Sequence, residues 1–305
     1  MRVVTIGGAT LDIVVAGANT ALGPGAKHDV ASIGWSMGGG AVNAALGFAA
    51  FHAHVIALCA VGADVEGRWL RDTLIRQGIS VEGVQTIPGC ATGKAVIHLD
   101  PQGEAAVFAQ RGASTRLSLK GAAAMLMQAD VVYISALADA ATVQLNQTLT
   151  EPSCHPFRLA VNPGARQLRQ SPHLLEPSLQ AADLICLNAV EAQLLAASRK
   201  LACTGDLSAS DAVELACALA HRPAQCVLIT LGADGAAFFD GSKGHYHPAE
   251  RVAVVSTLGA GDAYASAFAF HWFSGHGASA SLLAANRSAA VVLQVASANQ
   301  ATLAM

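Results

Sequence analysis

Charged residues are scarce in this sequence. Asp, Glu, Lys and Arg make up 13% of the 305 residues, and 18 basic against 21 acidic side chains leave a formal net charge of −3. No run of lysine or arginine would suit a polyanion or an acidic membrane surface. Nucleic acid is therefore not an expected partner.

Cysteines are few, and their spacing is irregular. The seven cysteines include no Cys-x-x-Cys pair, and their number is odd. A disulfide framework would call for an even set, and a thiolate zinc site for paired motifs, so the sequence predicts neither. A reducing, cytoplasmic location is expected.

Unbroken apolar runs of membrane-spanning length are also missing. Residues 30–63 and 263–286 contain no Asp, Glu, Lys or Arg, but Gly, Ser, Asn and His interrupt both stretches. A membrane helix needs about 20 mostly apolar residues, so we predict buried helices and strands and no membrane partner. The apolar stretch before Gly7 is too short for a signal-peptide core and predicts a first buried strand.

Two familiar nucleotide-binding sequences do not occur. The chain has no Gly-x-x-x-x-Gly-Lys-Ser/Thr loop, and no Gly-x-Gly-x-x-Gly follows the first expected strand. These loops bind phosphates in phosphate-loop NTPases and dinucleotide-dependent enzymes. Both classes are thereby disfavoured.

Hydrophobic residues are plentiful, at 53% of the chain, which is enough for a substantial core. Short β-type runs alternate with helical segments, and this order predicts a mainly parallel sheet between two helical layers, a three-layer α/β/α sandwich. We expect one domain spanning residues 1–305. The expected strands are residues 3–6, 55–60, 131–135, 158–161, 184–187 and 227–230, and the expected helices are 41–51, 65–77, 119–128, 189–197, 211–221 and 260–273.

A different pattern predicts a small β-sheet lid. Two β-rich runs, 92–100 and 104–110, flank the turn-prone triplet Pro101-Gln102-Gly103. With residues 14–33 this hairpin is expected to form a lid over the cleft, built from about 14–33 and 92–110. A small lid has free edges and an apolar face that ligand or a second subunit must cover, so we expect a homodimer through the lid. Its apolar side chains include Val96, Ile97, Val107 and Phe108.

The segment Ser256-Thr257-Leu258-Gly259-Ala260-Gly261-Asp262 is the strongest candidate for chemistry. It lies between an expected strand at 252–255 and the helix that begins near Ala260. Small residues let the backbone approach a ligand, and the free N–H groups of a first helical turn favour an anion. Asp262 could then accept the proton of a hydroxyl that attacks phosphorus. The local pattern equally admits a tight turn in which Asp262 only interacts with the helix dipole.

Two further polar positions follow glycines. Gly38-Gly39-Gly40 leads into a helix with Asn43, whose amide could meet a polar ligand, although close helix–sheet packing explains the glycines equally well. Asp12 follows the carboxyl end of the first strand, the edge where open α/β sheets bind ligands. Asp12 could accept hydrogen bonds from two sugar hydroxyls or could cap a turn.

Taken in order, five motifs resemble the ribokinase-like (phosphofructokinase B, PfkB-type) carbohydrate kinase family over nearly the whole chain. They are a GG-x-x-x-N entry to a helix at Gly38–Asn43, G-x-D-x-x-G at Gly62–Gly67, N-x-x-E at Asn188–Glu191, T-x-G-x-x-G at Thr230–Gly235 and T-x-GAGD at Thr257–Asp262. Each is weak alone, and their order makes the resemblance specific.

The resemblance implies an ATP-dependent kinase with Mg²⁺ as cofactor and a small-molecule acceptor. It makes Asp262 the catalytic base, and it makes the backbone of Gly259, Ala260 and Gly261 the anion hole for the transferring phosphoryl group. The remaining matched positions divide by ligand. Asp12, Gly39 and Asn43 would bind the acceptor, Asn188, Thr230, Gly232, Gly235 and Asn286 would bind the nucleotide, and Glu191 would hold Mg²⁺ through water.

Several polar residues lie outside these motifs. Arg111 follows the lid hairpin and could close on substrate, or could be a solvated loop arginine. Arg166 could reach phosphates from the carboxyl end of a strand. The His-x-His pairs at 52/54 and 245/247 are not part of a recognisable ligand set with Cys or carboxylate partners, so packed or surface histidines are expected instead of a metal site.

The acceptor itself stays open at this stage. A sugar, a sugar acid or a nucleoside fits, and a non-catalytic ligand-binding protein on the same fold is the alternative from another class. Ser256 stands where most relatives carry aspartate, so we expect only mild dependence on K⁺, with Ser256 shaping the turn or capping the helix.

Overall fold

The larger of two sheets forms the middle layer of the molecule. Its strands are β1 (Arg2–Ile6), β4 (His54–Gly62), β5 (Val84–Ile87), β8 (Val131–Ile134), β9 (Arg158–Val161), β10 (Leu184–Asn188), β11 (Cys226–Thr230), β12 (Ala236–Phe239) and β13 (Gly244–His247). The computed structural model describes residues 1–17, 27, 29–100, 105–149, 156–203 and 205–295, and it orders the strands β13-β12-β11-β10-β9-β8-β1-β4-β5. Neighbours from β11 across to β5 are parallel, whereas β12 pairs antiparallel with both β11 and β13.

Successive residues of the central strands point into two separate hydrophobic clusters. In β1, Val3 joins the cluster that contains Val55 of β4, and Val4 joins the cluster that contains Ile56. Side chains alternate between the faces of a strand, so these near-continuous apolar runs bury both faces. Each face therefore needs a layer of helices.

The helices supply these two layers, which confirms the α/β/α sandwich. The cluster around Val3 is covered by α1 (Gly40–Ala49), α2 (Val65–Arg76), α9 (Ala260–Phe273) and α10 (Ala278–Leu293). The cluster around Val4 is covered by α3 (Ala123–Met127), α4 (Asp139–Leu149), α5 (Ala165–Gln170), α6 (Pro172–Ala181), α7 (Ala189–Ser198) and α8 (Ala209–Leu219). Among the described residues, no helix is long and apolar enough to cross a membrane.

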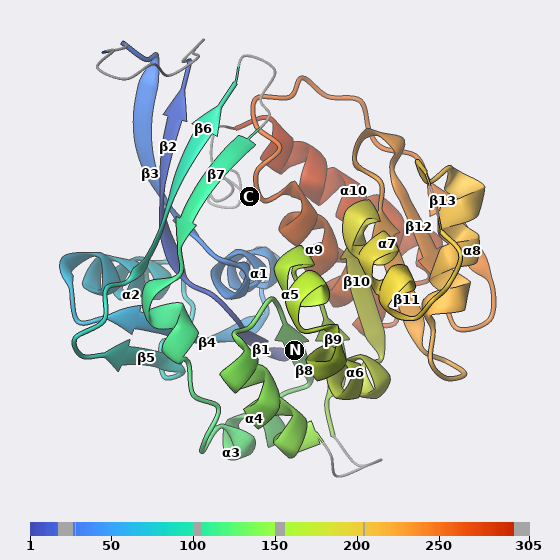
Figure 1. Cartoon of the computed structure of the whole chain (residues 1–305), viewed down its shortest axis with the longest axis horizontal. Coiled ribbons are helices and arrows are strands. Elements are labelled where there is room, and N and C mark those ends of the chain that lie inside the picture. The colour runs from blue at the N-terminus through green and yellow to red at the C-terminus, as the bar shows by residue number, and fades with distance from the viewer. Residues whose placement is uncertain (18–26, 28, 101–104, 150–155, 204, 296–305) are drawn as a thin grey trace.

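A second sheet of four strands stands apart from the main body, at the upper left of Figure 1. It comprises β2 (Thr10–Ala16), β3 (Ser32–Gly38), β6 (Gly93–Leu99) and β7 (Ala105–Gln110), in the order β3-β2-β6-β7. Strands β2 and β3 reach further toward the main body than the expected segment 14–33. The expected turn at Pro101–Gly103 lies outside the described residues.

The two faces of this lid differ in exposure. Val14 and Ile97 are buried and pack with Leu258, which precedes α9, so this face is directed toward the main body. The opposite face carries Trp35 and Phe108, which are 68% and 70% exposed. Adjacent residues of a strand point to opposite faces, so the four apolar side chains expected on one face of the lid lie on two. Val96 and Phe108 lie on the exposed face, and Ile97 and Val107 lie on the other.

Asp64 ties the lid to the main body. Its carboxylate caps α2 by accepting from the amide of Gly67 at 2.9 Å, and it also accepts from the amide of Thr92 at 2.7 Å, immediately before β6. The hydroxyl of Thr92 accepts from the amide of Gly62 at 2.9 Å. The side chains of Asp64 and Thr92 together thus link β4, α2 and the entry to the lid.

Two expected elements differ from the structure. Residues 252–255 form no strand, because Val255 bonds through its amide to the carbonyl of Leu293 at 2.7 Å, and Val254 and Val255 are almost half exposed. The expected helix at 119–128 is reduced to α3, because Gly121 adopts a left-handed φ of 83°.

Candidate active site

The start of α9 presents free backbone amides. Gly259 adopts a left-handed φ of 76° at the N-cap, a conformation that favours glycine, and Ala260 begins the helix. In the part of the chain that the structure describes, the amides of Gly261 and Asp262 donate to no backbone carbonyl. Free amides of this kind, together with the helix dipole, favour an anion, in agreement with the sequence pattern.

Asp262 is held by a side chain from a distant part of the sequence. Nδ2 of Asn43, on α1, donates to Oδ2 of Asp262 at 2.8 Å. Burial raises the pKa of Asp262 above its usual value of 3.8, and the hydrogen bond from Asn43 partly offsets this rise. The structure therefore brings two predicted site residues into contact and holds the aspartate with a proton affinity higher than that of an exposed carboxylate.

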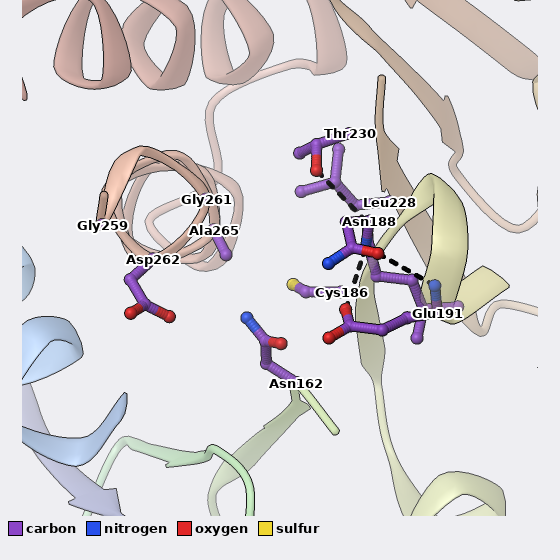
Figure 2. Close-up of a pocket in the computed structure, with 11 residues that line it drawn as sticks. Asn162, Cys186, Asn188, Glu191, Leu228, Thr230, Gly259, Gly261, Asp262 and Ala265 are labelled. Carbon is purple, nitrogen blue, oxygen red and sulfur yellow. Dashed lines mark hydrogen bonds between the residues drawn. The ribbon is translucent and has the colours of Figure 1, made fainter. Parts of the chain in front are cut away.

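A cavity of about 210 Å³ opens between α9 and the carboxyl ends of the parallel strands. Figure 2 shows Asp262 projecting from the start of α9, with Glu191 and Asn188 on the opposite side and Asn162 between them. Gly259, Gly261 and Thr230 also line it. The cavity thus gathers predicted residues from three separate motifs.

Glu191 and Asn188 form a capping box at the start of α7. Oδ1 of Asn188 accepts from the amide of Glu191 at 2.9 Å, and Oε2 of Glu191 accepts from the amide of Asn188 at 3.0 Å. Burial raises the pKa of Glu191 to about 7; the amide bonds from Asn188 and Ala165 lower it, and the charge of Asp262 adds to the rise. One oxygen of each side chain therefore accepts a hydrogen bond that stabilises the start of α7.

Asp12 lies on a lid strand instead of in the loop that the sequence suggested. It is buried in β2, its Oδ1 accepts from the hydroxyl of Thr10 at 2.6 Å, and burial raises its pKa, with a smaller contribution from the charge of Asp262. Gly39 precedes α1 with φ 90°, and a Cβ there would lie 2.4 Å from the carbonyl oxygen of Gly8. Glycine at 39 thus brings the entry to α1 against the loop that leads to Asp12.

A larger, mostly apolar pocket of about 840 Å³ lies on the other side of the α9 start. Its lining includes Thr230, Gly232, Gly235 and Asn286, which are predicted nucleotide-binding residues, and it shares Asn188 and Gly261 with the smaller cavity. The side chain of Asn286 accepts from the amide of Glu250 at 3.2 Å and donates to the carbonyl of Pro248 at 3.0 Å. These bonds hold the pocket wall at residues 248–250.

Ser256 shapes the loop before α9. Its side chain is buried, and its Oγ accepts from the amide of Leu258 at 3.2 Å, which confirms the expected role in the turn. The expectation that Ser256 caps the helix is wrong, since Gly259 is the N-cap and no side chain bonds there. The expected weak dependence on K⁺ stays a prediction.

Asn162 is a cavity residue that the sequence patterns did not single out. It follows β9 at the carboxyl edge of the sheet, and its Nδ2 donates to the hydroxyl of buried Tyr133 at 2.9 Å. Cys186 of β10 lines the cavity as well. The signal that could have identified Asn162 is its place directly after an apolar strand, where parallel sheets bind ligands.

Neither of the two predicted arginines lines either cavity, and neither do the histidine pairs. Arg111 is exposed at the start of the 3₁₀ helix η1 (Gly112–Arg116), and Arg166 lies on α5. His245 pairs with the Asp240 carboxylate at 2.7 Å. Within the described ranges, no group of three or more His, Cys, Asp or Glu side chains is placed to hold a metal ion.

A mainly parallel α/β/α sandwich with a separate small sheet, and an aspartate at a glycine-rich helix start on the wall of a cavity, are the features that the sequence predicts for a small-molecule kinase of ribokinase-like fold. The chain belongs to the pfkB family of carbohydrate kinases, which it matches over residues 1–304. It is thus a carbohydrate or nucleoside kinase.

Individual relatives agree with this assignment. The chain is 28% identical to a mouse ribokinase over 77% of this chain and 71% of that protein. It is 25% identical to a ribokinase of Haemophilus influenzae over 76% of this chain and 73% of that protein. A nucleoside kinase of Burkholderia thailandensis, solved in complex with inosine, has the same fold, with a TM-score of 0.81 and 19% identity over 99% of this chain and 94% of that one.

Proposed function

We propose that this protein transfers the γ-phosphoryl group of Mg·ATP to a hydroxyl group of a small sugar, sugar acid or nucleoside. One observation carries the proposal: the 840 Å³ pocket and the 210 Å³ cavity adjoin at the start of α9, where Gly261 lines both. A nucleotide in the larger pocket would direct its phosphates toward the free amides of Gly261 and Asp262. Phosphoryl transfer depends mainly on such positioning and on electrostatic stabilisation.

Asp262 is the proposed general base. Its carboxylate would accept the proton of the acceptor hydroxyl as that oxygen attacks the γ-phosphorus. The hydrogen bond from Asn43 fixes the carboxylate and stabilises its ionised form against burial. Asp12, Gly39 and Asn43 would then border the acceptor, and Gly259, Ala260 and Gly261 the transferring group.

The chemistry of the cavity fits Mg²⁺. Two carboxylates, Glu191 and Asp262, face the same small cavity, and among the described residues neither has a lysine or arginine within 4.0 Å. Carboxylate and water oxygens are the ligands that Mg²⁺ prefers. When bound, Mg²⁺ would neutralise charge on the ATP phosphates, and Glu191 is the residue proposed to hold it, through water.

Production of ADP tests the proposal directly. Purified protein with Mg·ATP is assayed against neutral sugars, sugar acids and nucleosides, and at least one acceptor should raise turnover well above background hydrolysis. An adenosine- or pseudouridine-type nucleoside kinase is the alternative within the class. If no acceptor raises turnover while ligands still shift the melting temperature, the non-catalytic ligand-binding alternative replaces the kinase.

The exposed lid face supports a homodimer. Ile13 lies opposite both Trp35 and Val96, and Val96 lies opposite Phe108, so the four side chains form a row across all four strands. Large apolar side chains gathered on one face mark interaction surfaces.

We also propose a cytoplasmic location, because the cysteines of the described residues are all free thiols.

A further inference from the structure

The inner face of the lid, the face that packs with Leu258, carries two polar side chains side by side. Ser36 of β3 lies directly opposite Asp12 in the antiparallel pair of β2 and β3. Residues directly opposite each other project from the same face of a sheet, and both of these are buried. Their neighbours on this face, Val14 and Ala95, are apolar. We call Asp12 and Ser36 the polar lid pair.

The hydroxyl of Ser36 is buried and, among the described residues, has no hydrogen-bond partner. The carboxylate of Asp12 does not supply one, because it is turned away along the strand. Its Oδ1 accepts from the hydroxyl of Thr10 at 2.6 Å, and its Oδ2 lies where a Cβ at Gly38 would overlap it. A buried hydroxyl without a partner is unfavourable, so Ser36 calls for a partner that binds from outside the chain.

Two contacts place the polar lid pair opposite the start of α9. One row outward along the lid, Val14 packs with Leu258, which lies four residues before Asp262. One row inward, Gly38 ends β3, and α1 then begins and reaches Asp262 through Asn43, with a hydrogen bond of 2.8 Å. The polar lid pair lies between these two contacts (Figure 1 labels β2, β3, α1 and α9). Its side chains therefore face the acceptor side of the proposed active site.

Asn43 adds a second buried atom without a partner. Its Nδ2 donates to Asp262, whereas its Oδ1 accepts no hydrogen bond within the part of the chain that the structure describes. A carboxylate and an amide oxygen only accept, and a serine hydroxyl also donates. A ligand that satisfies Asp12, Asn43 and Ser36 together must both donate and accept. Hydroxyl groups do both, whereas an ionised carboxylate has no hydrogen to donate.

We propose that Ser36 binds a second hydroxyl group of the phosphoryl acceptor, beside the one that Asp12 binds, and so selects for acceptors that carry both. The inference rests on the proposed kinase function and assigns a specificity-determining residue to β3, which the sequence patterns did not single out. An acceptor that lacks the second hydroxyl would leave Ser36 buried and unpaired in the complex. A site built to hydrogen-bond a substrate hydroxyl rejects analogues without it for this reason.

A purely structural role for Ser36 predicts a different result. If the side chain only fills space on the inner face, Ser36→Ala removes an unpaired hydroxyl from the fold and should affect all acceptors alike. In the binding role, the same variant should weaken only acceptors that carry the second hydroxyl. An analogue without that hydroxyl makes no bond to Ser36, so it has nothing to lose.

The test compares acceptors with analogues that lack one hydroxyl. The compounds are D-ribose, D-gluconate and inosine, each with its 2-deoxy and 3-deoxy analogue on the sugar. The variants are Ser36→Ala and Ser36→Thr, which keeps a hydroxyl, and the matched control is Ser32→Ala, at an exposed position of the same strand. Kinetic constants for acceptor and ATP are measured, binding of each compound is followed by calorimetry, and melting temperatures check that each variant folds.

For the wild type, we expect one analogue to fall at least about tenfold below its parent in kcat/KM, the scale of a lost hydrogen bond that leaves a buried group unpaired. Ser36→Ala should lower kcat/KM for the parent by about the same factor, mainly through KM, and should change that analogue less than about twofold, because the two losses remove one interaction. KM for ATP should stay unchanged. Ser36→Thr should retain part of the preference for the parent, and Ser32→Ala should match the wild type.

Two results would overturn the inference. One is a Ser36→Ala variant as active as the wild type on every parent acceptor, and the other is a loss of equal size for the parent and all its analogues. A panel with no turnover at all would count against the proposed kinase function, and calorimetry then decides the role of Ser36 separately. Binding of a parent compound that Ser36→Ala weakens, with one analogue unaffected, would support the site. No binding to the wild type, or binding that the variant leaves unchanged, would refute it.

Discussion

At the residue scale, the contact between Asn43 and Asp262 joins two motifs that lie 219 positions apart. Each motif alone admitted a structural explanation, and the sequence pattern could not exclude it. Their contact supports the proposed roles of both residues, because a glycine-rich turn by itself needs no amide donor aimed at its aspartate. The neutral partner also keeps Asp262 free of an ion pair, which would lower its pKa and weaken it as a base.

Replacement of Asp262 tests its role most directly. Asp262→Asn should keep nucleotide binding but lower turnover at least about 100-fold, the low end of general-base effects, because an amide cannot accept the hydroxyl proton. Turnover is measured at saturating Mg·ATP and acceptor, and nucleotide binding by calorimetry. Asp72→Asn, at an exposed position on α2, is the matched control. Near-normal turnover of the Asp262 variant would remove this residue from the mechanism.

The pH profile of the wild type follows from the direction of the Asp262 shift. A general base works when ionised, so kcat/KM should fall as the pH drops through a pKa that burial has raised above 3.8. Asn43→Ala removes the donor that lowers this pKa, so its acid limb should move to higher pH. The measurement is kcat/KM for the best acceptor between about pH 4 and 9. An unchanged acid limb in the Asn43 variant would show that another group controls it.

At the element scale, six strands of the main sheet (β1, β4, β8, β9, β10 and β11) were predicted because they are short, mostly apolar runs buried on both faces, whereas β5, β12 and β13 were not predicted. The expected strand at residues 252–255 shows the limit of that signal: the residues suit a strand, but no strand pairs with them. Asp12 was expected in a loop for a related reason. Only the pairing of β2 with β3 and β6 extends the strand back to Thr10, and pairing depends on distant residues.

The candidate site was predictable only in part. Its residues in glycine-bearing motifs could be found, because close backbone approach requires glycine at fixed spacing. Asn162 lies in none of these motifs; its place directly after an apolar strand was the only signal, and its position in the cavity depends on where β9 ends relative to β10 and α9.

The link between α2 and the lid gives a prediction about stability. Burial alone would raise the pKa of Asp64, but hydrogen bonds from Thr92 and Gly67 outweigh it and lower the pKa below 3.8. The carboxylate therefore stabilises the fold above the unfolded-state pKa, and this stabilisation is lost as the pH falls through the folded-state value. Asp64→Asn should lower the free energy of unfolding by about 1–2 kcal/mol at pH 7, since it weakens a helix cap and charge-assisted bonds.

Urea denaturation of the Asp64 variant and wild type at pH 7 and near pH 3 measures this difference. The difference in free energy of unfolding between wild type and variant should shrink at the lower pH, where the wild-type carboxylate begins to protonate. Asp72→Asn, on an exposed part of the same helix, should leave the unfolding midpoint unchanged. If this difference in free energy of unfolding is as large near pH 3 as at pH 7, the charge of Asp64 is not the cause of the stabilisation.

At the scale of the whole molecule, the two sheets differ in how many of their faces are covered by other parts of the chain. The main sheet is covered on both faces by helices, whereas the lid is covered on one face only. Ile33, Trp35, Val96 and Phe108 are between 43% and 70% exposed on the other face. A second copy of the same lid is a natural cover, because a two-fold dimer places identical patches against each other.

The last prediction concerns this dimer. The wild type should have the mass of two chains at micromolar concentration by light scattering, and Trp35→Lys combined with Phe108→Asp should have the mass of one, because burying unpaired charge in an apolar interface is unfavourable. Ile75→Lys is the matched control, since Ile75 is 56% exposed on α2, outside the lid. A monomeric wild type would refute the dimer, and a dimeric lid variant would place the interface elsewhere. If the dimer also supports the acceptor side of the cleft, the lid variant should show a raised KM for the acceptor and an unchanged KM for ATP, because no described residue of the lid strands lines the 840 Å³ pocket proposed for the nucleotide.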